Sequence, residues 1–378
     1  MTASMSSQRI EASAVAAAIK GRGTASALSG RFERIDREPV DDGWPGTGED
    51  DSPGPQTRVL SEHARSIISR NRSPDIFFDL SINPYRGCEH GCIYCYARPN
   101  HGTIGLSPGL DFETRLFAKI NAAALLRKAL ASPSYRCEPI NIGSVTDPYQ
   151  PIERRFRITR EVLEVALAHR QPVTLITKSS LVERDLDLVA ALAHQSLATV
   201  CITVTTLDAG LARILEPRAT APWRRIETIR RLASAGIPVG VSIGPLIPFI
   251  NDQEIESLLA AAREAGALSA HYTVIRLPWE VDPLFRQWLS NHFPDRAARV
   301  LHRIQDMRGG RDNDPRFFTR MKGQGVFADL IRMRVTSAAR RLGMSRDRPP
   351  LRSDLFVRPV EPESGVSPAR PEQQLTLI

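Results

Sequence analysis

Three of the chain's five cysteines, Cys88, Cys92 and Cys95, fall within eight consecutive positions of a 378-residue sequence. Their spacing is C-x-x-x-C-x-x-C, which places three thiols on one short loop. Thiolates are soft ligands that bind zinc and iron–sulfur clusters. The loop is therefore a candidate metal centre, with these three cysteines as the ligands.

The spacing leaves more than one kind of centre open. Structural zinc sites are normally closed by four ligands, and His90 or His101 could supply the fourth. A disulfide would leave one thiol over and would be reduced in the cytosol. Three thiolates suit a cubane iron–sulfur cluster whose fourth iron takes a non-protein ligand. We favour the cluster, because an open metal position generally serves chemistry rather than scaffolding.

The composition bounds the class of protein. An apolar fraction of 42% is ample for a sizeable core. The first residues carry no apolar signal-peptide core, and no run approaches the roughly 20 apolar residues that span a bilayer. We therefore expect a cytoplasmic protein with no membrane partner, in which few cysteines indicate metal or redox chemistry rather than a disulfide framework.

The positive charge is concentrated near the end of the chain. The net charge is +8, and residues 295–352 alone contain 15 Lys and Arg against 6 Asp and no Glu. Such a region can attract phosphate-bearing partners, so DNA or RNA is a candidate partner. The alternative is a solvated face that only keeps the protein soluble.

Apolar β-like runs alternate with helical patterns through the middle of the chain. We expect helices over 112–131, 159–170, 182–194 and 223–236, and a further helix after residue 251. The six expected strands cover residues 77–83, 141–145, 172–177, 198–205, 237–243 and 270–276. Strands rich in Val and Ile that alternate with helices predict an α/β fold with a parallel sheet. Periodicity alone does not choose between an open barrel and a doubly wound sheet.

The candidate chemical residues follow the ends of these expected strands. The cysteines come after the first strand, "SVTDPYQPIE" after the second, "TKSS" after the third and "VTTLD" after the fourth. In both candidate architectures the catalytic surface lies where strands end and loops into helices begin. The sequence therefore predicts one shared site at that edge.

The motif "CEHGCIYC", with Tyr94 before the third cysteine, resembles the cluster motif of the radical S-adenosylmethionine superfamily. The resemblance implies a partial (β/α)6 TIM-like barrel over about residues 75–290. It also implies a [4Fe-4S] cluster on Cys88, Cys92 and Cys95, whose fourth iron chelates S-adenosyl-L-methionine. Tyr94, beside the cluster, is a candidate to pack against the adenine.

Three further stretches, "GSVTDPYQPIE", "LITKSS" and "PLIPFIND", are similar to the spore photoproduct lyase-like branch and its uncharacterised bacterial relatives. The resemblance implies that Ser144 and Lys178 contact S-adenosylmethionine, and Asp147 is a further candidate for that ligand. One departure concerns the hydrogen-donating cysteine on that branch's second strand. This chain has Gly143 and Ser144 there, which argues against repair of DNA photoproducts.

The expected organisation has four parts. Residues 1–57 and 360–378 are rich in Pro, Gly and charge without periodicity, which predicts disordered extensions. Residues 75–290 form the radical core, and residues 291–359 form a basic, helical C-terminal extension.

The expected function is that of a radical enzyme. It would use an external low-potential electron donor to cleave S-adenosylmethionine reductively. The resulting 5′-deoxyadenosyl radical would abstract hydrogen from a substrate that the sequence does not identify. No catalytic residue is assigned. The alternative is a non-catalytic iron–sulfur or zinc protein that binds nucleic acid through its basic C-terminal region.

Overall fold

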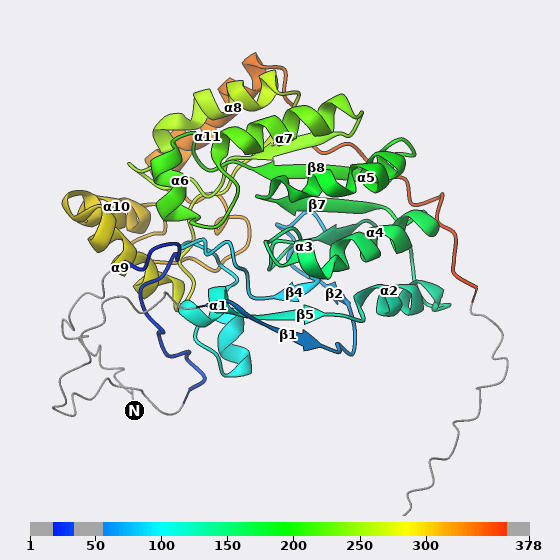
Figure 1. Cartoon of the computed structure of the whole chain (residues 1–378). Helices are drawn as coiled ribbons and strands as arrows, with labels where there is room; N and C mark the ends of the chain where they lie inside the picture. Colours follow the sequence, from blue (N-terminus) through cyan, green and yellow to red (C-terminus); the bar gives the residue numbers. More distant parts are fainter. Residues whose placement is uncertain (1–17, 34–55, 361–378) are drawn as a thin grey trace, which may run out of the picture.

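The computed structural model describes residues 18–33 and 56–360 (Figure 1). The expected disorder of the tail at 361–378, and of residues 1–17 and 34–55, concerns positions outside the described residues. Within the described part, helices and strands alternate along most of the chain, as the sequence pattern predicts.

The main sheet has seven strands in the order β10-β9-β8-β7-β6-β3-β2. Its strands are β2 (Ile68–Arg70), β3 (Leu80–Ile82), β6 (Ile140–Ile142), β7 (Val173–Thr177), β8 (Ala198–Thr203), β9 (Val239–Ser242) and β10 (Ser269–His271). All neighbours pair in parallel except β2, which runs antiparallel to β3. The six expected strands are therefore all present and parallel.

Helices follow these strands and cover an apolar face of the sheet (Figure 1). They are α2 (Ala122–Ala131), α3 (Glu153–Phe156), α4 (Ile158–Ala168), α5 (Leu186–Ala193), α6 (Ala209–Leu215), α7 (Pro222–Ser234) and α8 (Ile255–Glu264), with 3₁₀ turns at Ser180–Asp185 and Asp252–Glu254. The register aligns Ile142, Leu175 and Val200 in one buried apolar row. Because side chains alternate along a strand, the neighbouring row presents the other face.

That other row is polar. Asn141, Thr174 and Thr199 are aligned across β6, β7 and β8, and the Thr174 hydroxyl donates to the Asn141 side chain at 2.9 Å. A parallel sheet covered by apolar layers on both faces would show continuous hydrophobic strands. The polar row instead indicates that the face opposite the apolar row is not covered by a continuous apolar layer.

A second, three-stranded sheet has the order β1-β5-β4. Its strands are β1 (Arg58–Glu62), β4 (Tyr85–Arg86) and β5 (Arg115–Lys119). The prediction of one helix over 112–131 is wrong here. The structure forms α1 (Leu110–Thr114), then β5, then α2, because residues 115–119 pair in parallel with β1 and antiparallel with β4.

Residues 18–33, which we call the N-terminal strap, lie inside the extension that was expected to be disordered. They pack instead against α1, α9 (Val281–His292) and the cysteine loop, as Figure 1 shows. The Ser26 side chain donates to Gln287 of α9 at 3.1 Å, and the Ser26 carbonyl accepts from the Leu110 amide at 3.2 Å. Composition alone missed these contacts because the partners are far away in the sequence.

The C-terminal extension is helical, with α10 (Pro294–Asp306) and α11 (Gly325–Arg341). Helix α11 packs beside α8, and the Arg334 guanidinium pairs with Glu256 at 2.6 Å. Among the described residues, no helix combines the length and apolar character needed to cross a bilayer.

Candidate functional site

The cysteine loop begins directly after β4, at the carboxyl edge of β3. Cys88 and Cys92 are buried, Cys95 is partly exposed, and all three thiols are free. The loop turns at Gly91, whose φ of 67° is left-handed. A Cβ at Gly91 would lie 2.8 Å from a Glu113 carboxylate oxygen, so only glycine fits this turn without displacing its neighbour.

A buried arginine holds the loop from behind. Arg98 is fully buried, and its guanidinium donates to the carbonyls of Cys92 at 2.9 Å and Gly91 at 3.1 Å. The same guanidinium pairs with Glu113, also fully buried, at 2.6 Å. Two loop carbonyls are thereby fixed by one planar group, which sets the curvature of the segment that carries Cys88, Cys92 and Cys95.

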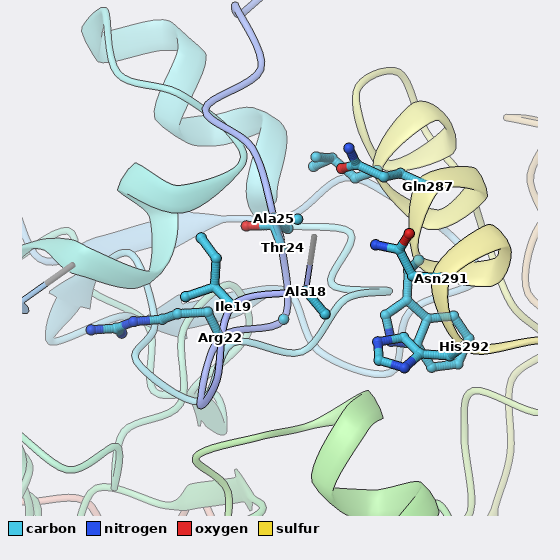
Figure 2. Close-up of a pocket in the computed structure, with 11 residues that line it drawn as sticks. Ala18, Ile19, Arg22, Thr24, Ala25, Gln287, Asn291 and His292 are labelled. Carbon is cyan, nitrogen blue, oxygen red and sulfur yellow. The ribbon is translucent and has the colours of Figure 1, made fainter. Parts of the chain in front are cut away.

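Glu113 in turn ties the loop to the N-terminal strap. Its carboxylate accepts from the Gly23 amide at 2.9 Å and from the Thr24 amide at 3.2 Å. Figure 2 shows strap residues Ala18 to Ala25 facing Gln287, Asn291 and His292 of α9. The strap is thus wedged between the cysteine loop and α9.

A substitution at Gly23 tests the contact between the N-terminal strap and the cysteine loop. A Cβ there would lie 1.8 Å from the Gly91 carbonyl oxygen. The substitution Gly23→Val should therefore prevent the N-terminal strap from packing against the cysteine loop. Amide hydrogen exchange over residues 18–33 should become about tenfold faster or more, because local opening lowers protection. Lys20→Val, at an exposed strap position, is the matched control. Equal protection in both variants would contradict the contact.

Tyr94 is anchored behind the loop by two charged residues. Its hydroxyl donates to the Glu216 carboxylate, and Glu216 pairs with Arg225 at 2.5 Å. Arg225 is 1% exposed and also donates to the carbonyls of Thr203 at 3.1 Å and Thr220 at 2.6 Å. The ring of Tyr94 therefore has a fixed position in the wall beside Cys92 and is itself buried.

Lys178 projects into the same region from the end of β7. Its Nζ lies 5.8 Å from the centre of the Tyr94 ring. Burial opposes its charge, but the nearby Cys92, Glu216 and Asp147 raise the pKa of Lys178 above its ordinary value. An ammonium group thus stands beside the cysteine loop, in a place where it can balance thiolates or a bound carboxylate.

Asp147 connects three of the loops that form this edge. Its carboxylate accepts from the Thr177 hydroxyl at 2.7 Å and from the Lys178 amide at 2.8 Å, and it lies 3.3 Å from His90 Nδ1. Burial raises the pKa of Asp147, but His90 and these hydrogen bonds outweigh it and lower the pKa to about 2. Asp147 is therefore an ionised brace between the cysteine loop and the loops after β6 and β7.

Ser144 lies at the partly exposed side of the site. The Asn83 side-chain amide donates to its hydroxyl at 3.0 Å, and its carbonyl accepts from the hydroxyl of Tyr96. Tyr96 is half exposed and follows Cys95 directly. The open side of the cysteine loop is therefore the side of Cys95, Tyr96 and Ser144.

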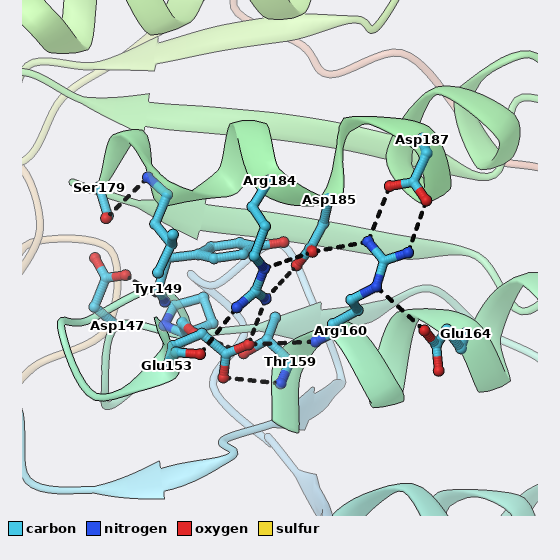
Figure 3. Close-up of polar contacts among 12 residues, drawn as sticks. Asp147, Tyr149, Glu153, Thr159, Arg160, Glu164, Ser179, Arg184, Asp185 and Asp187 are labelled. Carbon is cyan, nitrogen blue, oxygen red and sulfur yellow. Dashed lines mark hydrogen bonds and ion pairs between the residues drawn. The ribbon is translucent and has the colours of Figure 1, made fainter. Parts of the chain in front are cut away.

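A second network of ion pairs holds the loop after β6 in place. Figure 3 shows Arg184 between two fully buried carboxylates, with contacts of 2.6 Å to Glu153 and 2.7 Å to Asp185. Glu153 also accepts from the Tyr85 hydroxyl of β4 and from the Thr159 amide at 3.0 Å. The carboxylate of Glu153 is thus fully occupied by contacts that hold the loop after β6, and its role is structural.

The structure brings Tyr94, Asp147 and Lys178 together around the cysteine loop, with Ser144 at its rim. The sequence analysis missed four buried charged residues that hold these groups: Arg98, Glu113, Glu216 and Arg225. No sequence signal distinguishes them from the many other charged residues, because their burial depends on distant partners.

The histidines near the cysteines have other contacts. His101 is buried, and its Nε2 lies 2.9 Å from the Arg115 carbonyl oxygen, while His90 Nδ1 faces Asp147. Within the described residues, no group of three or more His, Cys, Asp or Glu side chains could hold a single metal ion. A cubane makes a different demand, because each thiolate binds its own iron.

The residues fit such a cluster. Burial raises the pKa of the Cys92 thiol to about 12, against the opposing effect of Lys178, and burial likewise raises the pKa of Cys88. The free thiols of Cys88 and Cys92 are therefore protonated at neutral pH, so that metal binding must release protons there. Lys178 beside Cys92 supplies positive charge for the thiolates, and Cys95 is the partly exposed thiol of the three.

The three thiols lie on one loop at the carboxyl edge of the six parallel strands of the main sheet. Residues 82–262 match the family model described as the Radical SAM superfamily. The chain is therefore similar to this superfamily over slightly less than half of its length.

Two uncharacterised proteins are similar to this chain in sequence. An uncharacterised protein of Mycobacterium tuberculosis is 34% identical over 224 residues, which cover 59% of this chain and 66% of the relative. An uncharacterised protein of Methanocaldococcus jannaschii is 29% identical over 243 residues, covering 63% and 84%. The chain thus matches just under two thirds of the length of the mycobacterial relative.

One similar solved structure is a point mutant of spore photoproduct lyase. It aligns with a TM-score of 0.54 and 14% identity, and the alignment covers 76% of this chain and 80% of that one. At this level of identity the likeness concerns the fold. It agrees with the resemblance to the spore photoproduct lyase-like branch that the sequence motifs indicated.

Proposed function

We propose that the chain is a radical S-adenosylmethionine enzyme that abstracts hydrogen from a substrate yet to be identified. The observation that carries this proposal is the loop of Cys88, Cys92 and Cys95, held by Arg98 and flanked by the partly buried Lys178. Six parallel strands with a polar face are consistent with a partial (β/α)6 barrel whose interior would receive the substrate.

The proposed roles follow from the contacts. Cys88, Cys92 and Cys95 would hold the [4Fe-4S] cluster, which supplies one low-potential electron for reductive cleavage of S-adenosylmethionine. Lys178 would pair with the methionine carboxylate, since a charge-assisted contact both binds and orients it. Ser144 would hydrogen-bond to the same ligand at the exposed rim.

Tyr94 and Asp147 would act differently from a direct ligand. The Tyr94 hydroxyl is occupied by Glu216, so only its ring face is available to line the cofactor site. Both carboxylate oxygens of Asp147 are engaged by internal donors. We therefore assign Asp147 to positioning Lys178 and the cysteine loop.

The proposal is tested by anaerobic purification and cluster reconstitution, followed by incubation with a strong reductant and S-adenosylmethionine. We expect slow formation of 5′-deoxyadenosine and methionine without added substrate. A protein that binds the cluster and S-adenosylmethionine but forms no 5′-deoxyadenosine would favour the alternative, a non-catalytic iron–sulfur protein. Stoichiometric zinc would favour the zinc form of that alternative.

Lys178→Met tests the assigned carboxylate contact. A hydrogen bond to a charged group contributes about 1.5–3 kcal/mol, so the affinity of the reconstituted protein for S-adenosylmethionine should fall about tenfold or more. Iron content should stay unchanged, because Lys178 is no cluster ligand. Lys128→Met, at an exposed position on α2, should leave both quantities unaltered. Unchanged affinity in the Lys178 variant would refute the assignment.

A further inference from the structure

The basic C-terminal extension does not form one open positive face. Arg308 is buried and donates to the carbonyls of Ile275, Thr319 and Arg320. Ion pairs in this region join Arg303 with Asp306, Arg316 with Asp314, Arg320 with Asp75, Arg332 with Asp329, and Arg334 with Glu256. Part of the positive charge of this extension is therefore paired with carboxylates.

Two cations of this extension line a cavity instead. The cavity lies between β10 and α11 and has a volume of about 80 Å³. Lys322, Arg346, His271, Tyr272 and Thr336 line it, and none of the described residues that line it is acidic. A single water needs about 10–15 Å³ on this scale, so the cavity has room for several waters or one small polyatomic group.

Lys322 occupies one wall with part of its hydrogen-bonding capacity unused. Its Nζ donates to the Tyr272 carbonyl oxygen at 2.7 Å, and an ammonium has three donors. Burial and the neighbouring Arg346 lower the pKa of Lys322 to about 8. In the described part of the chain, neither Lys322 nor Arg346 forms an ion pair with a carboxylate, and the Lys322 ammonium lies 3.6 Å from the centre of the Tyr272 ring.

Tyr272 provides an independent sign of a missing ligand. It is 5% exposed, and its buried hydroxyl has no hydrogen-bond partner among the described residues. An unsatisfied buried polar group costs about 1–3 kcal/mol. A hydroxyl donor, an ammonium and a guanidinium around one small cavity match the acceptor oxygens of an oxyanion.

We propose that the cavity between β10 and α11 binds a phosphate group, held by Lys322, Arg346 and Tyr272. The group could belong to a small phosphate ester or to a nucleic-acid backbone, since both present the same oxygens. The site requires neither the cluster nor S-adenosylmethionine. Its test is therefore independent of the proposed radical chemistry, and either can fail alone.

The first test measures binding of inorganic phosphate to the full chain by calorimetry, against chloride at equal ionic strength. Lys322→Met and Tyr272→Phe should weaken phosphate binding about tenfold and severalfold, as expected for losing a charged and a neutral hydrogen bond. Arg346→Ala removes an exposed side chain and so separates binding from folding. Arg340→Ala, an exposed arginine at the end of α11, is the control.

The second test separates the two sources of the group. A sugar phosphate and short DNA and RNA oligonucleotides are titrated into the wild type and the Lys322 variant at two salt concentrations. If only the sugar phosphate binds in a Lys322-dependent way, the site takes a small phosphate ester. If the oligonucleotides bind in a Lys322-dependent way and the binding falls steeply with salt, the site takes the phosphate of a nucleic-acid backbone. Binding that is equal in wild type, Lys322→Met and Arg346→Ala, or no stronger than binding of chloride, overturns the proposal.

Discussion

Replacing Cys88, Cys92 or Cys95 by Ala should abolish the iron–sulfur cluster completely. The reconstituted wild-type protein should contain about four iron and four sulfide per chain, the content of one cubane. Each single variant should fall to background in both analyses and lose the brown colour. The effect is all-or-none because each thiolate binds its own iron of the cubane.

The remaining two cysteines are matched controls. Cys201 is buried on β8, and Cys137 lies in the segment before β6, so neither belongs to the loop. Their Ala variants should keep the full iron and sulfide content. A wild-type protein that binds stoichiometric zinc without labile sulfide, or a loop variant that retains its cluster, would refute the assignment of the centre.

Replacing Arg98 by Met should destabilise the protein by about 3–5 kcal/mol, the typical cost of breaking a buried ion pair from one side. The substitution leaves the fully buried Glu113 without its cationic partner and removes the donors for the carbonyls of Gly91 and Cys92. We expect urea unfolding to show this loss in the free energy of unfolding. The same variant should release iron faster to a chelator, because the loop is no longer held.

An exposed ion pair nearby is the control for the loss in the free energy of unfolding. Arg115 is 55% exposed in its pair with Asp111 at 3.2 Å. Arg115→Met should change the free energy of unfolding by about 0–1 kcal/mol, as is usual for surface pairs. If Arg98→Met costs no more than this control, Arg98 does not hold the loop in the manner we describe.

Local patterns in the sequence determined the framework of this protein. Six runs rich in Val and Ile, alternating with amphipathic stretches, predicted the six parallel strands of the main sheet. The spacing of Cys88, Cys92 and Cys95 predicts a metal centre without reference to any other part of the chain, and this stays a prediction. Both signals are local, because strand periodicity and the spacing of ligands on a short loop depend only on residues that are close together in the sequence.

The helix predicted over 112–131 shows the limit of that approach. Its residues have helical composition, yet 115–119 form β5 because β1 and β4 offer hydrogen-bonding partners on both sides. Pairing of this kind depends on segments elsewhere in the chain, so tertiary context overrides local propensity. The N-terminal strap follows the same logic, since Gly23 is ordered by the distant Gly91 and Glu113.

The site divides in the same way. The sequence identified Tyr94, Asp147 and Lys178 as candidates, because they sit in or near recognisable motifs at strand ends. Only the tertiary structure showed that Tyr94 is held by Glu216, 122 positions away, and that Asp147 braces the loops rather than facing open space.

Burial explains the difference. A charged side chain enters the interior only with a partner, and the partner is chosen by the folded geometry rather than by sequence spacing. The sequence therefore fixes which groups can bind a metal, whereas the tertiary structure decides which charges are buried to hold them in place.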